Sequence, residues 1–566
     1  MITTHRQHNQ RLLQTAMPDL GSDDPDLAQL CEATDLLAAR IHQRIDDATG
    51  AHIQPILDVL RPHLLRTIPA ATLVQLATPR GAQARRLLPP GLVLDMQADR
   101  DAARPAAARQ HDLAACRFET TAPVDLVPIT VDFIHADDRH AGGELRVGLR
   151  AAQPGGLASA AAGPLRFFLT GALGPAAALA LWLCRGCERV DVLAAGRPLA
   201  GPSRPTVRCV GAARDFRMLP ADPGCDGLRA LQEYLVLPEK LACVEVTGLD
   251  ALRHHPGDSC ELVFSSAHAR LPDDHAAVTL RLGCVPVINL FAAAASPVRR
   301  TALCDEYLLR IDGHPRDSAD IFAVQTVTGL RASGASKHAY ASLAHNLGAA
   351  DPTNRHYSVL SRRSPLGAHD TVLRVDSPVD GAPDCDGEVL AIRLRATNRD
   401  LPLKLGARAR WDARASGFAD LEVAQVAPLS APAPAPTDAA MLWGLLAELG
   451  LDAGGLADAG RTRDYLRLHN ERCCGDLRQR RHNAAKIDAL RNLAVAPTTR
   501  PARGALLRGL LVELTLDEQA FAGPGDAFLF GEALTALLTD ITPINTFVEV
   551  RAQLYPDIRE LRWTTT

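Results

Sequence analysis

Lysine is scarce in this chain, and no excess of positive charge replaces it. Only four of the 61 basic residues are lysines, and 65 acidic residues give a formal net charge of −4. A chain of this balance lacks the global positive field with which proteins bind nucleic acid or anionic membranes. The composition therefore argues against a histone-like or polybasic binding role, and we expect no nucleic-acid partner.

Long hydrophobic runs are also missing. The most apolar stretch, residues 165–187, is interrupted by Gly171, Gly174 and Pro175, so it falls short of the roughly 20 apolar residues that span a bilayer and predicts a buried helix. Residues 1–20 contain no apolar core of the kind found in secretory signals. We therefore expect a cytoplasmic protein without direct membrane insertion.

The common signatures of nucleotide and hydrolase chemistry are absent. The sequence contains no P-loop, no strand-linked G-x-G-x-x-G, no H-E-x-x-H and no G-x-S-x-G motif. Gly257-Asp258-Ser259 resembles the nucleophile triplet of one esterase family, but a serine nucleophile needs a histidine base, and the Asp-x-x-His pairs precede this serine. The triplet fits a turn before a strand, and a hydrolase using Ser259 is kept as a distant alternative.

Cysteine supplies no complete metal site. The 13 cysteines are irregularly spaced, which is typical of buried thiols in a reducing compartment. Cys184-x-x-Cys187 is half of a zinc motif, and the adjacent Cys473 and Cys474 offer no matching pair for the four ligands of a closed site. We predict no catalytic, metal-binding or cofactor-binding residue, and no cofactor.

The remaining composition is that of a large globular chain, with 566 residues of which 47% are hydrophobic. Amphipathic spacing predicts one helix over residues 23–50 and a second from residue 53, which Pro62 should end. We assign residues 1–70 to this N-terminal helical hairpin. The two apolar stripes could bury each other or face a partner.

The middle of the chain, residues 71–427, has a sequence pattern typical of β-strands instead of amphipathic helices. Short alternating or β-branched runs recur between turn-forming residues, and two helices are expected at 176–184 and 226–234. We predict a β-rich, irregular region that forms two subdomains. Its expected strands are 127–133, 241–246, 278–282, 285–291, 321–327, 371–375 and 389–395.

An alanine- and proline-rich segment, residues 428–437, separates this region from the end of the chain. Such a composition favours an extended and solvated linker. Residues 438–566 then predict a small α/β domain with an apolar helix at 441–451, an arginine-rich stretch at 461–493, and strand, helix and strand at 506–516, 528–538 and 544–550. The arginine-rich stretch contains interspersed acids, which favours a solvated or protein-binding face over RNA binding. The fold class is thus α+β, elongated and multi-domain.

Several short motifs occur in an order that resembles one family. They lie in the segments E-Y-L-V-L-P-E-K, V-T-G-L, P-V-I-N-L-F, T-N-R-D-L-P, F-L-F-G and I-N-T-F. The sequence resembles the TssF family, also called VasA or ImpG, the baseplate wedge protein of bacterial type VI secretion systems. The residues that carry the likeness, and that become structural or interface candidates, are Glu233, Tyr234, Pro238, Glu239, Lys240, Gly248, Pro286, Asn289, Phe291, Asn398, Arg399, Asp400, Gly531, Asn545 and Phe547.

Physical reasons for some of these residues follow without the family. Pro238 should end the preceding helix, Asn398 to Asp400 should form a polar turn, and Asn289 must find hydrogen-bond partners if it is buried. Corner residues usually maintain the fold, so we expect most of the candidates to do so instead of contacting a partner.

The resemblance implies a structural protein and not an enzyme. It implies a wedge with TssG-like, TssK-like and TssE-like proteins, a second copy of this chain and a VgrG-like spike hub. That baseplate would form in the cytoplasm and be recruited to the inner-membrane complex. A wedge protein of a contractile phage tail or phage-like injection particle is the alternative within the same class.

Overall fold

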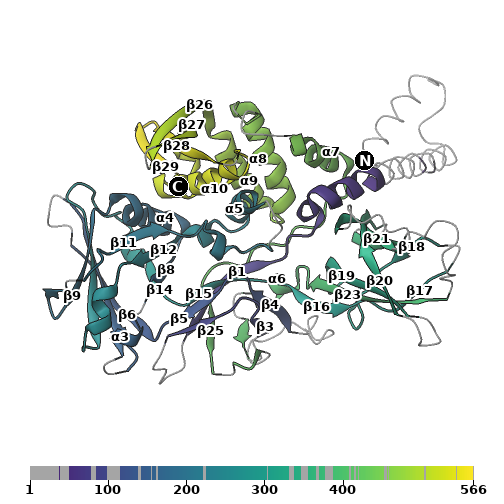
Figure 1. Cartoon of the computed structure of the whole chain (residues 1–566), viewed down its shortest axis with the longest axis horizontal. Coiled ribbons are helices and arrows are strands. Elements are labelled where there is room, and N and C mark those ends of the chain that lie inside the picture. Colours follow the sequence, from purple (N-terminus) through teal and green to yellow (C-terminus); the bar gives the residue numbers. More distant parts are fainter. Residues whose placement is uncertain are drawn as a thin grey trace, which may run out of the picture.

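The computed structural model is a mixed α+β structure that is rich in β-sheet (Figure 1). It describes residues 50–564, preceded by Ala33 and Leu37, which are both helical. The predicted helix over residues 23–50 otherwise lies outside the described residues. Undescribed gaps fall at residues 78–84, 99–114, 138–141, 154–155, 161–162, 200, 221–224, 302–303, 331–336, 346–354, 365–368, 376–386, 407–408, 414–415, 419, 451–454, 457, 503–504 and 544.

The N-terminal helical segment packs against a distant part of the chain. Residues 50–60 are helical, and Pro62 begins the 3-10 turn η1 (Pro62–Leu65), so the predicted end of the helix is confirmed. Ile53 and Leu57 pack with Leu442 and Leu445 of α7 (Ala439–Ala447). The start of the described chain therefore shares a small hydrophobic core with a helix almost 400 residues later.

A six-stranded antiparallel sheet occupies the centre of the molecule (Figure 1). Its strand order is β24-β3-β4-β15-β1-β25. The sheet collects strands from three separate parts of the sequence, so the middle region folds through long-range pairing. The bounds are β1 (Ala71–Ala77), β3 (Val93–Gln97), β4 (Cys116–Thr120), β15 (Cys284–Ile288), β24 (Arg410–Asp412) and β25 (Glu422–Gln425).

Two further antiparallel sheets lie beside the central one, on the left in Figure 1. The first has the order β10-β9-β13-β7-β6 and the second β11-β12-β8-β14. The bounds are β6 (Ile129–Asp137), β7 (Glu144–Ala151), β8 (Leu165–Thr170), β9 (Arg189–Ala194), β10 (Arg197–Pro198), β11 (Thr206–Cys209), β12 (Cys243–Thr247), β13 (Ser259–Ser265) and β14 (Thr279–Arg281), with the small pair β2 (Arg86–Leu88) and β5 (Val124–Leu126).

Helices and turns cover these sheets. The apolar stretch 165–187 is not one buried helix as predicted, because its first residues form β8 and Gly171, at φ +145°, turns the chain before α4 (Leu173–Leu181). The other elements are α3 (Leu157–Ala160), α5 (Asp226–Val236), the π-helix η3 (Trp182–Gly186) and the 3-10 turns η4 (Arg214–Phe216), η5 (Pro238–Leu241), η6 (Asp250–His254) and η7 (His275–Ala277).

A separate β-sheet lobe is formed by residues 291–397, on the right in Figure 1. Its order is β16-β23-β19-β20-β21-β22-β18, with β17 pairing to β23, and the β20–β21 contact is parallel. The bounds are β16 (Phe291–Ala294), β17 (Val298–Arg299), β18 (Glu306–Leu308), β19 (Asp320–Leu330), β20 (Lys337–Ser342), η8 (Leu343–His345), β21 (His356–Arg363), β22 (His369–Val375) and β23 (Val389–Thr397), followed by α6 (Leu401–Leu405).

The alanine- and proline-rich segment is paired with the protein, contrary to the predicted solvation. The Ile68 and Ala433 backbones exchange hydrogen bonds of 2.8 and 2.9 Å, and the Ser430 N–H donates to the Ala71 carbonyl at 2.8 Å. Ala433 is buried. Proline removes donors only at its own positions, so the alternating residues still pair with residues 68–71. The domain boundary placed here stays a prediction.

The C-terminal region follows the predicted order of elements. The predicted strand, helix and strand appear as β27, α10 and β28, and α10 connects the parallel pair β27–β28. The sheet order is β26-β27-β28-β29, and α10 also packs against α5 and α4. The bounds are η10 (Glu448–Gly450), α8 (Ala459–Cys473), α9 (Leu477–Asp488), β26 (Leu490–Ala502), β27 (Ala505–Asp517), η11 (Glu518–Ala520), α10 (Pro524–Asp540), β28 (Thr546–Tyr555) and β29 (Arg559–Thr564).

Candidate functional site

The first group of motif residues forms a buried ion pair. Glu233 on α5 and Lys240 on η5 are both fully buried, and the Lys240 ammonium donates to the Glu233 carboxylate at 2.6 Å and to the Gly211 carbonyl at 2.7 Å. The same carboxylate accepts the backbone N–H groups of Met218 and Leu219. Burial lowers the pKa of Lys240, and the charge of Glu233 opposes that shift. The pair fixes the corner that Pro238 creates after α5.

The neighbouring Tyr234 connects this corner to the C-terminal region. Its hydroxyl donates to the Asp526 carboxylate of α10 at 2.7 Å, and the Lys486 ammonium of α9 lies 2.7 Å from the other Asp526 oxygen. Lys486 also donates to the Tyr234 oxygen at 3.1 Å. Burial, followed by the Asp526 charge, raises the pKa of Tyr234. Three helices from two regions thus meet in one buried polar cluster of Tyr234, Lys486 and Asp526, which we call the Tyr234 junction.

Asn289 forms a second buried connection, as expected for a buried amide. Its nitrogen donates to the Arg117 carbonyl at 2.7 Å and to the Asn398 side-chain oxygen at 2.9 Å. Its oxygen accepts the Thr397 hydroxyl at 2.8 Å and the Asn398 N–H at 2.7 Å. This fully satisfied amide joins the end of β15 to the end of β23, where the central sheet meets the lobe.

The other candidates lie at turns and packing positions. Asn398 begins the predicted polar turn, in which Arg399 takes a positive φ of 53°. Asp400 ends that turn immediately before α6 and lies 3.2 Å from Lys404. Gly531 lies so close to Trp563 that a β-carbon would overlap its ring. Pro238, Pro286, Phe291 and Phe547 are buried, Glu239 and Gly248 are half-buried, and Asn545 is exposed. Burial of most candidates favours the fold-maintaining role.

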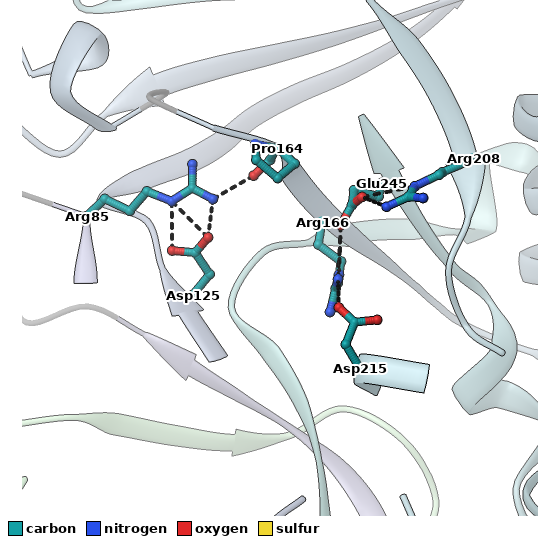
Figure 2. Close-up of polar contacts among 7 residues, drawn as sticks. All are labelled: Arg85, Asp125, Pro164, Arg166, Arg208, Asp215 and Glu245. Carbon is teal, nitrogen blue, oxygen red and sulfur yellow. Dashed lines mark hydrogen bonds and ion pairs between the residues drawn. The ribbon is translucent and has the colours of Figure 1, made fainter. Parts of the chain in front are cut away.

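Three neighbouring strands carry a ladder of ionic contacts that was not predicted from the sequence (Figure 2). Glu245 on β12 lies directly between Arg208 on β11 and Arg166 on β8 in the strand register. It accepts from Arg208 at 2.6 Å and from Arg166 at 2.9 Å, and Arg166 also contacts Asp215 at 2.9 Å. No sequence signal marks the three partners, because the strand register brings them together.

A second ionic contact in Figure 2 joins the small strand pair β2–β5 to the sheet that contains β8. The Arg85 guanidinium binds the Asp125 carboxylate and donates to the Pro164 carbonyl at 2.7 Å (Figure 2). Pro164 immediately precedes β8, which carries Arg166. Cations and acids alternate in this group, so it stabilises the packing of two sheets and offers no net charge to a ligand.

The enzymatic and metal-binding alternatives gain no support from the geometry. Ser259 is exposed and begins β13 after a bend at Gly257 and Asp258, as the turn interpretation predicted. Within the part of the chain that the structure describes, no three His, Cys, Asp or Glu side chains gather as possible metal ligands. Among the same residues, no helix is both long and apolar enough to cross a membrane.

Comparison with known proteins decides the family. The family model described as type VI secretion system, TssF, matches residues 6–566. The chain belongs to the TssF family. The resemblance found in the motifs is therefore confirmed, and the chain is a structural baseplate component of a type VI secretion system, not an enzyme.

Relatives agree over nearly the whole length. The chain is 28% identical to type VI secretion system component TssF1 of Pseudomonas aeruginosa over 599 aligned positions, covering 95% of this chain and 92% of that protein. A solved chain of a TssK-TssF-TssG baseplate subcomplex superposes with a TM-score of 0.76 at 26% identity, covering 95% of this chain and 98% of that one. A chain of a type VI baseplate complex, at 19% identity and a TM-score of 0.62 over 100% and 98% of the two chains, shares the fold.

Proposed function

We propose that the chain acts as the wedge scaffold of its baseplate and binds TssG-like and TssK-like subunits. The observation that carries the proposal is the likeness, at a TM-score of 0.76, to a chain of a TssK-TssF-TssG subcomplex. The family resemblance adds a TssE-like protein, a second copy of this chain and a VgrG-like hub. On this proposal the wedge forms in the cytoplasm and is recruited to the inner-membrane complex.

The N-terminal helical hairpin and the C-terminal α/β domain are the proposed partner-facing parts. The helix over residues 50–60 has two apolar faces. The first face carries Ile53 and Leu57, which pack against α7. Its other face presents Ile56 and Leu60, which are 47% and 56% exposed. Apolar side chains one helical turn apart that remain exposed are typical of a helix that packs against a further helix. We propose a TssG-like subunit as its neighbour.

Deletion of the C-terminal region from Met441 would be a poor test. Leu442 and Leu445 form a core with the helix over residues 50–60, and the Tyr234 junction would lose Lys486 and Asp526. A truncated chain would therefore misfold whether or not it binds partners. Surface substitutions on the folded chain separate the two effects.

The test compares two charged variants of the tagged full-length chain in its native host. Ile56→Asp/Leu60→Asp should lose the TssG-like subunit during purification while keeping the wild-type circular dichroism and melting temperature. Leu308→Asp, at a 42%-exposed leucine of the lobe, is the matched control and should keep its partners. Equal partner recovery in both variants would contradict the helical interface. Absence of TssG-like and TssK-like chains from the wild type would contradict the whole proposal.

A further inference from the structure

Two strands at the edges of neighbouring sheets border one groove. β6 is the last strand of the sheet β10-β9-β13-β7-β6, and β14 is the last strand of the sheet β11-β12-β8-β14, both on the left in Figure 1. Residues from 127–136 and 275–283, with the end of β1, line a groove of about 670 Å³, which we call the β6–β14 groove. A groove of this size can take up several side chains of a partner.

The buried part of this lining is apolar. Leu280 of β14 is 2% exposed, and Val131 and Ile134 of β6 are half-buried. Thr130 and Thr279 stand on the two walls and are exposed. An apolar side chain that enters between these walls would therefore leave water and gain the free energy of apolar burial.

β14 presents a backbone donor and acceptor to the groove. Leu280 lies opposite Leu169 of β8 in the strand register. The Leu169 N–H points to the other side of β8, where it donates to the Ala242 carbonyl at 3.0 Å. The N–H and C=O groups of one strand residue point to the same side, so Leu280 and Leu169 are a non-hydrogen-bonded pair. The N–H and C=O of Leu280 therefore point away from β8, on the side of the groove.

The opposite edge is less suited to pairing with a further strand. The register of β6 with β7 shifts between Val131 and Phe133, which marks a β-bulge. Bulges interrupt the hydrogen-bond ladder, and proteins use them on edge strands to prevent strand addition. A segment in the groove should therefore pair with β14. Because β14 spans only Thr279–Arg281, that segment must also bind through its side chains.

Arg281 gives the groove a positive charge. It is half-buried, and its guanidinium donates to the side-chain oxygens of Gln75 at 2.9 Å and Thr170 at 3.4 Å, which are both uncharged. The acid that lines the opposite wall, Asp132, is paired with Arg150 at 2.6 Å. Charge complementarity therefore calls for a carboxylate on the segment that fills the groove.

We propose that the β6–β14 groove binds an extended segment of a different protein subunit of the baseplate. This inference rests on the proposed function. The segment pairs its backbone with that of Leu280, places apolar side chains against Val131 and Ile134, and sets an Asp or Glu against Arg281. A donor and an acceptor at a strand edge match a polypeptide backbone, which favours a protein segment over lipid or nucleic acid.

The test places a photo-crosslinking amino acid at position 279, and separately at position 130, of the full-length chain in its native host. Both probes should label the same peptide of one stoichiometric baseplate subunit, in which Asp or Glu lies among apolar residues. A probe at position 206 is the matched control, because Thr206 is exposed on β11, the other edge of the sheet that ends in β14, and should not label that peptide.

Charge reversal tests the role of Arg281. In the background Arg281→Glu the yield from position 279 should fall about tenfold or more. Arg270→Glu reverses an exposed arginine that does not line the groove and should leave the yield unchanged. Wild-type melting temperature shows that each variant is folded. If Arg281→Glu melts lower, Arg281→Gln keeps a hydrogen-bond donor while it removes the charge, and it should lower the yield in the same direction.

Several results would overturn the inference. These are a cross-link within the chain, to a second copy of it, to lipid or to nucleic acid, labelling of different proteins from positions 279 and 130, a yield unchanged by loss of the Arg281 charge, or no product from either position. If the wild type recovers no TssG-like or TssK-like chain, the proposed function fails. If it recovers them while positions 279 and 130 give no product, only the groove contact fails.

Discussion

The C-terminal region and the lobe of residues 291–397 are attached to the body in opposite ways. Phe530 and Leu534 of α10 belong to the same hydrophobic core as Leu231 and Leu235 of α5, and the Tyr234 junction adds buried charges at that contact. The lobe has a hydrophobic core of its own, which includes Tyr340, Leu373 and Leu390, while Phe322 of β19 belongs to the larger core of the body. The region that follows a linker-like composition is therefore joined to the body through a continuous core. The lobe, which no change of composition marks, packs mainly around its own core and meets the body at Phe322 and Asn289.

Both regions contain a buried acid with hydrogen-bond and ionic partners, but the two acids differ in whether those partners come from one region or from two. Asp526 of α10 binds Tyr234 of α5 and Lys486 of α9, so it joins two helices of the C-terminal region to one helix of the middle region. In the lobe, Glu388 accepts the Tyr340 hydroxyl at 2.6 Å and contacts Arg355 at 3.0 Å, and all three residues lie within the lobe. Loss of the first acid should therefore disturb two regions together, and loss of the second only one.

The largest effect is expected from Asp526→Ala. The change leaves the buried Lys486 ammonium without its carboxylate and deprives the Tyr234 hydroxyl of its acceptor. Removing one partner of a buried ion pair costs about 3–5 kcal/mol. Urea unfolding followed by circular dichroism should show this loss, and hydrogen exchange should rise in α5 and α10 together.

Asp464→Ala is the matched control for this prediction. Asp464 is a 77%-exposed acid on α8 that pairs with Arg467, so its loss should change the free energy of unfolding by about 0.5 kcal/mol or less. Exchange that rises in α10 while α5 stays protected in Asp526→Ala would show that the two regions unfold independently, against the continuous core.

A smaller and local effect is expected from Glu388→Gln. The amide still accepts the Tyr340 hydroxyl, but Arg355 loses its charged partner in a buried position. Hydrogen bonds to charged groups contribute about 1.5–3 kcal/mol, so the lobe should lose about that much stability. Hydrogen exchange should increase in β19–β23 and remain unchanged in α5 and α10. An equal increase in those helices would remove the contrast between the two attachments.

Local patterns in the sequence predicted individual helices, strands and turns better than they predicted the contacts between distant segments. The helix at 226–234, the strand at 389–395 and the turn at 398–400 follow from spacing, proline and polar residues, and each was found as α5, β23 and the turn before α6. The predicted solvation of residues 428–437 was wrong because Ser430 and Ala433 pair with residues 68–71, which is a long-range contact. The composition of a segment predicts its local backbone conformation, but it does not predict which distant segment will pair with it.

The candidate residues show the same limit. Family motifs singled out Glu233, Tyr234 and Lys240, yet the partners Asp526 and Lys486 carry no motif and lie more than 240 residues away. The ladder of Glu245 with its two arginines went unnoticed because it exists only once the strand register is fixed. Buried polar groups must be paired, so a polar motif residue predicts a partner without naming it.

The smallest expected effect is a pH dependence at a third attachment, where the N-terminal segment meets the body. Burial, followed by the positive charge of Arg61, lowers the pKa of His63 from 6.5 to about 3, and its ring nitrogen lies 3.5 Å from the Cys225 sulfur at the start of α5. His469, Arg66 and Arg472 also face it and act in the same direction. The folded protein thus holds this imidazole neutral, whereas the unfolded chain protonates it below its ordinary pKa.

Protonation therefore favours unfolding as the pH falls below 6.5, and the loss continues until the pH reaches about 3. At pH 5 the free energy of unfolding should be about 2 kcal/mol lower than at pH 7.5 through this residue. His63→Gln should remove that part of the slope, measured by urea unfolding at both pH values. His52→Gln changes an exposed histidine on the preceding helix and should keep the slope. Parallel slopes for wild type and His63→Gln would mean that this attachment, unlike the Tyr234 junction, does not depend on a buried titratable group.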